Sequence, residues 1–317
     1  MKKIYLLLIF LLLPFFVFAC GGGGGDGGGT PPTQDNPPLV SLSWPTDQQL
    51  IGGTMTAEFQ VSDDKGIEKV EFLIDNAIDV TKTDTSGNQG ILRIDFNADA
   101  LYTGTHTLKV QATDTSRNAS SATVEVKVDP VELRKQALQF LRDFNTWKAP
   151  YGATGGVRRW DSMPLILEVS SDIVRDGFLS AYQEAADFWT KYTGITFQIV
   201  ASAESRVENP MTGKLGVVFF EYGEPFPAGN AMCTWVNTDD STRTHYIAAI
   251  VTVGDGYGNH KTLIAHELGH CLGIGMEVDD GTITDHSSAK WRMNPVTAEA
   301  MKILYFELVP GSLVPLS

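Results

Sequence analysis

The sequence predicts two folded domains in one chain, an all-β sandwich followed by an α/β domain. Residues 38–129 consist of short alternating or β-branched segments separated by turn clusters, with no helical stretch between them. Residues 151–317 follow the order strand, helix, several strands, helix, which is an α/β arrangement. With 317 residues, the chain has room for two ordinary domains, each with its own core.

The composition describes a globular and acidic protein. Hydrophobic residues make up 43% of the chain, and the mean hydropathy is −0.06. There are 24 basic against 38 acidic residues, and the isoelectric point is near 4.8. Binding to nucleic acid and electrostatic attachment to a membrane both depend on positive charge, so we expect neither.

Residues 1–19 predict an export signal that is not part of the fold. Lys2 and Lys3 precede an apolar run over residues 4–19, which Pro14 interrupts. The run ends in V-F-A-C, which resembles the lipobox of bacterial lipoprotein signal peptides. The resemblance implies that Cys20 is lipidated and anchors the protein in the bacterial cell envelope, on the periplasmic face or the cell surface. Phe18 is bulkier than most residues at its position, and an ordinary signal ending near Cys20 is the alternative.

Residues 20–37 predict a tether between the lipidated cysteine and the first domain. This segment is rich in glycine and proline and has no large apolar residue. It cannot bury enough apolar surface to offset the entropy lost on ordering.

The first domain is predicted to contain six strands, at residues 39–42, 55–61, 69–75, 91–96, 106–113 and 122–128. The phrases SDDKGIEKVEFLID, GTHTLKVQATD and SATVEVKV resemble the bacterial immunoglobulin-like modules of secreted enzymes. That resemblance implies an immunoglobulin-like sandwich over residues 38–129, to which we assign a spacer role.

We expect His106 to be structural. Asp63 and Asp64 could bind Ca²⁺, although a solvated turn is favoured.

Residues 130–150 are predicted to connect the two domains. Pro130 opens an amphipathic helix over residues 131–147 that places Ala137, Leu138, Leu141 and Phe144 on one face. We expect this face to pack against one of the domains.

The second domain is predicted to contain five strands, at residues 164–169, 195–201, 215–220, 232–236 and 246–253. A helix over residues 176–193 follows the first of them and ends at Gly194. Its apolar stripe comprises Phe178, Tyr182, Ala185, Trp189 and Tyr192.

The segment TLIAHELGHCLG at residues 262–273 contains an H-E-x-x-H arrangement. His266 and His270 lie one turn apart on the same helix face, so both imidazoles can converge on one metal ion. Imidazole nitrogen suits Zn²⁺, and Glu267 lies beside the metal where it can take a proton from a bound water. The pattern predicts a hydrolytic zinc site on a helix that Asn259 caps and that ends at Gly273 and Gly275.

Cys233 and Cys271 remain once Cys20 is set aside. An even pair in an oxidising compartment suggests one disulfide that would hold the end of the metal helix. A small buried thiol at Cys271 is the alternative.

A catalytic zinc site needs three protein ligands and one open position. The segment HELGHCLG resembles the start of the metzincin motif H-E-x-x-H-x-x-G-x-x-H, but Met276 stands where that motif has its last histidine. The later stretch D-H-S-S and the residues WRMNP resemble the third histidine and Met-turn of matrixins. The resemblance implies that His286 is the third ligand and that Met293 packs beneath the metal. Asp279, Asp280 and Asp285 compete for the ligand position.

The matrixin-like resemblance covers residues 151–308 and implies a zinc endopeptidase fold. It implies a cleft in which an edge strand at residues 232–236 pairs with an extended polypeptide substrate. One Zn²⁺ held by His266, His270 and His286 would polarise the substrate carbonyl, while Glu267 acts as the general base.

Other interpretations of the second domain remain open. His245 and His260 could each hold an accessory ion, although both are expected to lie outside the site. A surface adhesion or glycan-binding lipoprotein with a degenerate zinc domain is the main alternative function. Zinc-dependent hydrolysis of a non-peptide amide is another.

Overall fold

The computed structural model describes residues 35–82, 89–145, 156–207, 216–223, 231–237, 245–275, 280–285 and 289–315, and for residues 78, 80–82, 89 and 235–237 it describes the backbone alone. Residues Asn36–Ser317 form one compact unit. The predicted export signal and Cys20 lie outside the described residues. Among the helices of the described part of the chain, none is long and apolar enough to cross a membrane.

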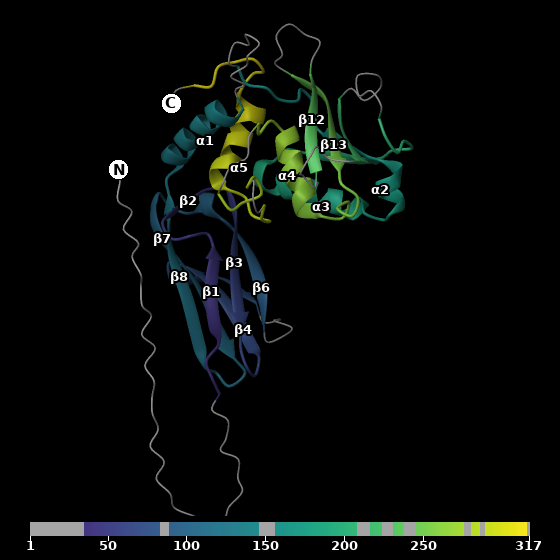
Figure 1. The fold of residues 1–317 in the computed structure, drawn as a ribbon. Helices are drawn as coiled ribbons and strands as arrows, with labels where there is room; N and C mark the ends of the chain where they lie inside the picture. Colours follow the sequence, from purple (N-terminus) through teal and green to yellow (C-terminus); the bar gives the residue numbers. More distant parts are fainter. Residues whose placement is uncertain are drawn as a thin grey trace, which may run out of the picture. The chain divides into compact units, whose positions relative to one another are not determined.

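Two β-sheets form the N-terminal domain (Figure 1). One sheet has the strand order β1-β3-β6 and the other the order β2-β8-β7-β4-β5. The strands are β1 (Leu39–Trp44), β2 (Gln49–Ile51), β3 (Thr54–Ser62), β4 (Ile67–Ile74), β5 (Ala77–Lys82), β6 (Gln89–Asn97), β7 (Gly104–Asp114) and β8 (Ala119–Val128). Alternate residues of β7, such as Leu108, Val110 and Ala112, are fully buried in a shared core. The predicted all-β sandwich is therefore confirmed.

Strands β5 and β2 were missing from the sequence-based prediction. The strand predicted over residues 69–75 corresponds to β4, and the chain turns directly after β4 at Asp75 and Asn76, which have φ values of 50° and 66°. These values suit a two-residue hairpin turn, and Ile74 pairs with Ala77 across it. The edge strand β5 follows this turn directly. Strand β2 is only three residues long, too short to show an alternating pattern.

His106, which the sequence predicts to be structural, is held inside the sandwich by two hydrogen bonds. Its Nδ1 lies 2.6 Å from Asp75 Oδ2, and its Nε2 lies 2.8 Å from the carbonyl oxygen of Tyr102. Because both partners are acceptors, the ring satisfies both bonds only as the imidazolium. Burial alone lowers the pKa of His106, but the bond to the Tyr102 carbonyl and the Asp75 carboxylate outweigh it, so the pKa is raised above 6.5.

We expect Asp75→Asn to lower the thermal unfolding midpoint more at about pH 6 than at about pH 8.5. A raised folded-state pKa stabilises the fold fully below the unfolded value of 6.5, and this contribution is lost as the pH rises through the folded pKa. The amide keeps an acceptor for the Thr107 amide but removes the charge facing His106. Thermal melts over this pH range check the prediction, with the exposed Asp64→Asn as control. An equal loss at both pH values would contradict it.

The C-terminal domain is a five-stranded sheet with helices packed against it. The sheet order is β10-β9-β11-β13-β12, in which β12 alone is antiparallel to its neighbour and forms an edge. The strands are β9 (Leu165–Val169), β10 (Phe197–Ala201), β11 (Val217–Tyr222), β12 (Ala231–Asn237) and β13 (Tyr246–Val253). The helices are α1 (Pro130–Phe144), α2 (Ser171–Arg175), α3 (Leu179–Thr193), α4 (Lys261–Cys271) and α5 (Pro295–Lys302), and the last continues as a π-helical turn, Ile303–Glu307.

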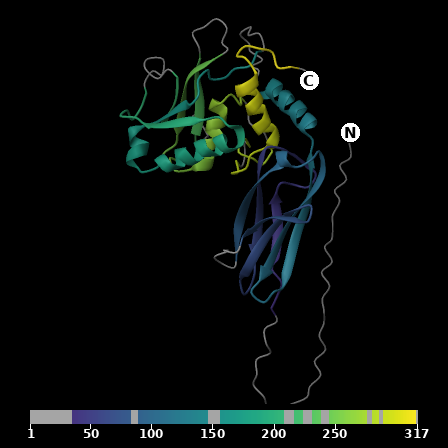
Figure 2. The same ribbon diagram turned by 180° about the vertical axis from the view of Figure 1, so that it is seen from behind.

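Helix α1 packs against α5, and the two lie side by side in both views of the chain (Figure 1 and Figure 2). Its N-cap is Asp129, whose side chain accepts the amide of Glu132, and Pro130 occupies the first helical position. The buried face includes Ala137, Leu138 and Leu141. These side chains belong to the core of the C-terminal domain.

The predicted helix over residues 176–193 was wrong at its N-terminal end. Helix α3 begins only at Leu179, and Gly177, with φ of 80°, lies between α3 and the short helix α2 that ends at Arg175. A positive φ is inexpensive only for glycine, so the helix cannot run through this position at low cost. The predicted C-terminal end at Gly194 agrees with the structure, since Gly194 has φ of 80° and caps α3.

Candidate metal centre

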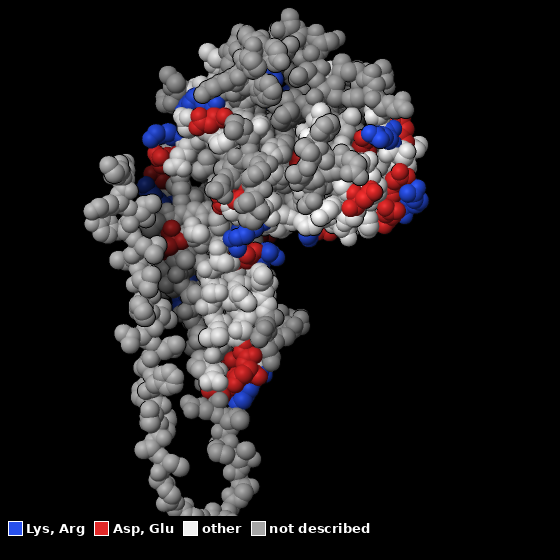
Figure 3. All heavy atoms as spheres, in the orientation of Figure 1, with Lys and Arg blue, Asp and Glu red and all other residues white. Residues whose placement is uncertain are grey.

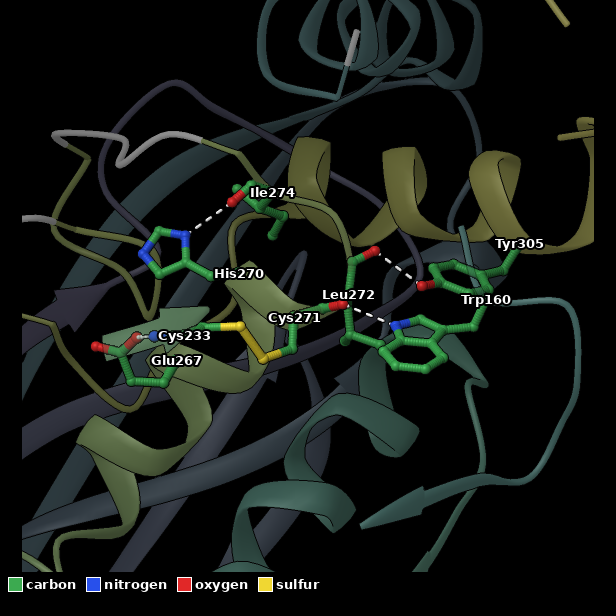
Figure 4. The surroundings of a disulfide bond; sticks show 8 residues. All are labelled: Trp160, Cys233, Glu267, His270, Cys271, Leu272, Ile274 and Tyr305. Atoms are coloured by element: carbon green, nitrogen blue, oxygen red, sulfur yellow. Dashed lines mark hydrogen bonds between the residues drawn. A yellow bond between two sulfur atoms is a disulfide. The ribbon is translucent and has the colours of Figure 1, made fainter. Parts of the chain in front are cut away.

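Helix α4 carries the H-E-x-x-H segment and is fixed by side chains that bond its backbone. Trp189 Nε1 donates to the Ala265 carbonyl, Trp160 Nε1 to the Cys271 carbonyl and Tyr305 OH to the Leu272 carbonyl, each at 2.8 Å. The last two bonds are seen beside the disulfide in Figure 4. The end of the helix is therefore held by donors that satisfy carbonyls with no partner in the helix.

Helix α4 begins at a different residue from the one predicted and ends where the sequence predicts. The N-cap is His260, not Asn259, because the Nδ1 of His260 accepts the Leu263 amide at 3.3 Å. At the other end Gly273 has φ of 112°, and a Cβ there would lie 2.7 Å from Asn145 Nδ2. Glycine is required at this turn for both reasons.

His266 and His270 are oriented by backbone carbonyls. His266 Nδ1 lies 2.8 Å from the Ile283 carbonyl oxygen, and His270 Nδ1 lies 2.7 Å from that of Ile274. A carbonyl only accepts, so each Nδ1 carries a proton, and in the neutral form of each ring Nε2 is the nitrogen without one. The ring centroids are 4.8 Å apart, with an interplanar angle of 88°. A carbonyl behind each imidazole is the usual outer-shell arrangement of metal-binding histidines.

Burial keeps the His270 ring neutral. Desolvation, reinforced by the electrostatic interaction with His266, lowers the pKa of His270 to about 4, and the Ile274 carbonyl opposes the change only in part. A neutral imidazole is the form that binds a divalent metal, so the protonation state suits the donor role.

Glu267 is buried between helix α4 and the edge strand β12. Its exposed fraction is 5%, and its Oε2 accepts the backbone N–H of Cys233 on β12 at 2.8 Å (Figure 4). Burial raises the pKa of Glu267 to about 7, and the bond from Cys233 partly offsets it. The carboxylate thus lies against the strand at the edge of the sheet.

Cys233 and Cys271 are joined by a disulfide. The bond links β12 to the last residue of α4, one position after His270 (Figure 4). The edge strand β12 and helix α4 are therefore connected covalently as well as through the Glu267 hydrogen bond.

The structure brings together two of the three predicted nitrogen donors, while the third lies outside the described residues. His286 and Asp279 are both outside them. In the part of the chain that the structure describes, no three His, Cys, Asp or Glu side chains form a group that could hold a metal. Asp280 and Asp285 therefore do not complete the site with the two histidines. Asp280 instead accepts hydrogen bonds from Thr282 and from Asn294.

The other residues singled out from the sequence have structural partners. Met293 is 3% exposed and belongs to the core of the C-terminal domain. His245 Nε2 lies 3.0 Å from Asp161. Asp63 accepts the amides of Lys65 and Gly66, which is the arrangement of a turn.

Sequence reasoning missed the groups that hold the site in place. Some of these groups belong to the backbone, namely the carbonyls of Ile274 and Ile283 and the amide of Cys233. Every residue has such groups, so the residue type does not reveal which of them bond the site. Trp160 and Tyr305 do have one, because a buried indole or phenol needs a hydrogen-bond partner.

The fold and the site define a chain with a β-sandwich followed by an α/β domain whose helix carries two oriented histidines. Residues 38–110 match the bacterial Ig domain family, so the sandwich is a bacterial immunoglobulin-like domain. Such a domain indicates an extracellular or surface protein. No curated protein matches the sequence.

Solved structures resemble part of the chain. The fibronectin(III)-like modules of Clostridium thermocellum CbhA are 22% identical, with a TM-score of 0.25, over 29% of this chain and 47% of that one. The endo-beta-1,4-mannanase of Thermotoga petrophila is 18% identical, with a TM-score of 0.26, over 31% and 21%. The chain thus spans less than half the length of these two structures.

Proposed function

We propose that the C-terminal domain is a zinc metalloendopeptidase of the matrixin-like metzincin type, acting outside the cytoplasm. The observation that supports this most is the orientation of His266 and His270, each donating through Nδ1 to a backbone carbonyl so that Nε2 is the metal-binding nitrogen. Because both carbonyls bond Nδ1, the neutral rings present Nε2, the nitrogen that can bind a metal, from the same face of one helix.

His266, His270 and His286 would hold one zinc ion. The ion would supply Lewis acidity for the scissile carbonyl and for the attacking water. Glu267 would accept the proton of that water and deliver it to the leaving amine. The Cys233 amide holds the carboxylate in place for both transfers.

A polypeptide substrate is favoured by the position of Glu267 against an edge strand. Within the described sheet, β12 pairs with β13 alone, so its other edge can accept an extended peptide as an added strand. A peptide bound in this way would pass beside the Glu267 carboxylate. A non-peptide amide would gain nothing from the strand.

The surface charge fits a secreted enzyme and offers little for a nucleic acid. On the face shown in Figure 3, acidic and basic side chains of the described residues lie in small mixed groups.

We further propose that a lipid on Cys20 holds the chain at the bacterial envelope. The mass of the mature N-terminal peptide tests this part of the proposal.

Zinc stoichiometry and cleavage of an unfolded protein such as casein test the proposed function together. We expect one zinc per chain and cleavage that a chelator abolishes. His286→Ala should weaken zinc binding by at least ~100-fold, more than the loss of an outer-shell partner causes. His245→Ala is the control, because His245 pairs with Asp161 and does not cap the helix that carries the site.

Asp279→Asn decides between the competing ligands. If Asp279→Asn loses zinc while His286→Ala retains it, Asp279 is the third ligand and His286 is not. A wild-type chain that binds no zinc and cleaves nothing would favour the surface adhesion alternative.

A further inference from the structure

The backbone of Ile283 connects a metal-binding histidine to the segment before α5. Its carbonyl accepts His266 Nδ1 at 2.8 Å, and its amide donates to the Arg292 carbonyl at 2.8 Å. The second bond pairs two segments that lie on either side of the predicted third ligand in the sequence. This bond therefore links the backbone of Arg292 to the residue whose carbonyl bonds the His266 ring.

The side chain of Arg292 reaches the immunoglobulin-like domain. Its Nη2 forms an ion pair with Glu58 of β3 and lies 3.2 Å from Ser43 Oγ of β1. Its guanidinium carbon lies 5.5 Å from the ring centre of Trp44, also on β1. The Arg292 side chain is only 14% exposed, so these contacts are largely shielded from water.

Glu58 is held by arginines from both domains. Arg93 on β6 donates to its Oε2 through Nε at 2.9 Å and Nη2 at 2.6 Å, while Arg292 pairs with Oε1. Burial alone raises the pKa of Glu58, but the bonds and charges of Arg292, and then of Arg93, outweigh it and lower the pKa. The carboxylate is therefore ionised at neutral pH. A largely buried charge pair of this kind is costly to break from one side.

We infer that the Glu58–Arg292 ion pair makes the immunoglobulin-like domain part of the support of the metal site, with Arg292 as a positioning residue for His266. This inference rests on the proposed zinc site. It also replaces the spacer role assigned from the sequence, because a spacer would not contribute a buried carboxylate to this segment.

Another contact between the domains provides a matched comparison. Lys191 on α3 lies 2.6 Å from Asp95 of β6, and this ion pair leads to no residue bonded to His266 in the described part of the chain. If the domains merely adhere, neither loss should reach the metal site, although losing the more buried Arg292 should cost more stability. If Arg292 positions His266, only its loss should reach the metal site.

The experiment compares Arg292→Gln and Glu58→Gln with Lys191→Gln and Arg93→Gln in the full folded chain. Zinc affinity is measured by chelator competition, the geometry of the site by the absorption of bound Co²⁺, and the Ile283 amide by hydrogen exchange in the metal-free protein. We expect the first two variants to weaken zinc binding about threefold to tenfold, at or below the range for outer-shell partners. They should also shift the Co²⁺ bands and speed exchange at Ile283. The two controls should leave all three readouts near wild type.

Equal effects of Arg292→Gln and Lys191→Gln, with exchange at Ile283 unchanged, would overturn the inference. If wild-type protein binds no zinc, the proposed function fails, and the exchange of the Ile283 amide still decides whether Arg292 holds this segment. Should Arg292→Gln fail to fold, Arg292→Lys is measured in the same way. Lysine keeps the positive charge but lacks the planar guanidinium with its several donors and its contact with the Trp44 ring. We therefore expect the same readouts to change in the same direction as in Arg292→Gln, but by less.

Discussion

Glu267→Gln is expected to abolish peptide cleavage while zinc remains bound. The amide is nearly isosteric with the carboxylate and can still accept the Cys233 amide, so the fold should be preserved. It cannot accept a proton from water, and loss of a general base lowers turnover by about 10²- to 10⁴-fold. Cleavage of a casein-type substrate and zinc stoichiometry, measured on the same preparation, check both parts of the prediction.

Glu221→Gln is the matched control for this substitution. Glu221 on β11 is 4% exposed and accepts the Val207 amide at 2.8 Å, so it is also a buried glutamate bonded to a backbone amide. Burial raises its pKa as it raises that of Glu267. We expect this control to cleave at nearly the wild-type rate. Full activity in Glu267→Gln would remove Glu267 from the mechanism, and equal losses in both variants would point to a general effect of altering a buried glutamate.

The features that the sequence predicted correctly are those that depend on side-chain periodicity. The strand predicted over residues 106–113 corresponds to β7, and its alternate residues Leu108, Val110 and Ala112 have no exposed surface. The stripe on α3 predicts the burial of Tyr182 and Trp189, which is also observed. Burial of apolar surface decides both patterns, and it can be read from residue types alone.

The boundaries that the sequence missed were decided by backbone conformation. Strand β5 begins just after two non-glycine residues with positive φ, and asparagine and aspartate adopt such values more readily than most residues. Helix α2 was not predicted because only Ile173 is buried in it, which is too little for a periodic signal.

The support of the candidate site could not be predicted, because it depends on distant partners. Glu58 and Arg292 are 234 residues apart, and each alone resembles an ordinary surface charge. The histidines were recognised from their spacing, since four residues bring them to one face of a helix. The Ile283 carbonyl that orients His266 belongs to a loop whose path depends on the fold of the whole domain.

Removing the disulfide with Cys233→Ala and Cys271→Ala should cost both stability and cleavage activity. The bond closes a loop with a sequence separation of 38, for which the chain-entropy model gives about 4 kcal/mol of unfolding free energy. Cleavage should fall further than stability explains, because the strand carrying the Cys233 amide would no longer be tied to α4 and Glu267 would lose a fixed partner. Urea unfolding gives the first quantity. Turnover at a temperature where circular dichroism shows a folded chain gives the second.

Reduction of the wild-type protein by a phosphine provides the control for the two substitutions. It should reproduce both losses in the wild type and change nothing in the double variant, which has no disulfide to reduce. A double variant that is less stable but turns over substrate at the wild-type rate would show that the disulfide stabilises the fold without positioning Glu267. The Cys233 amide is a backbone group and survives the substitution, so such a result would mean that the hydrogen bond alone holds the carboxylate against β12.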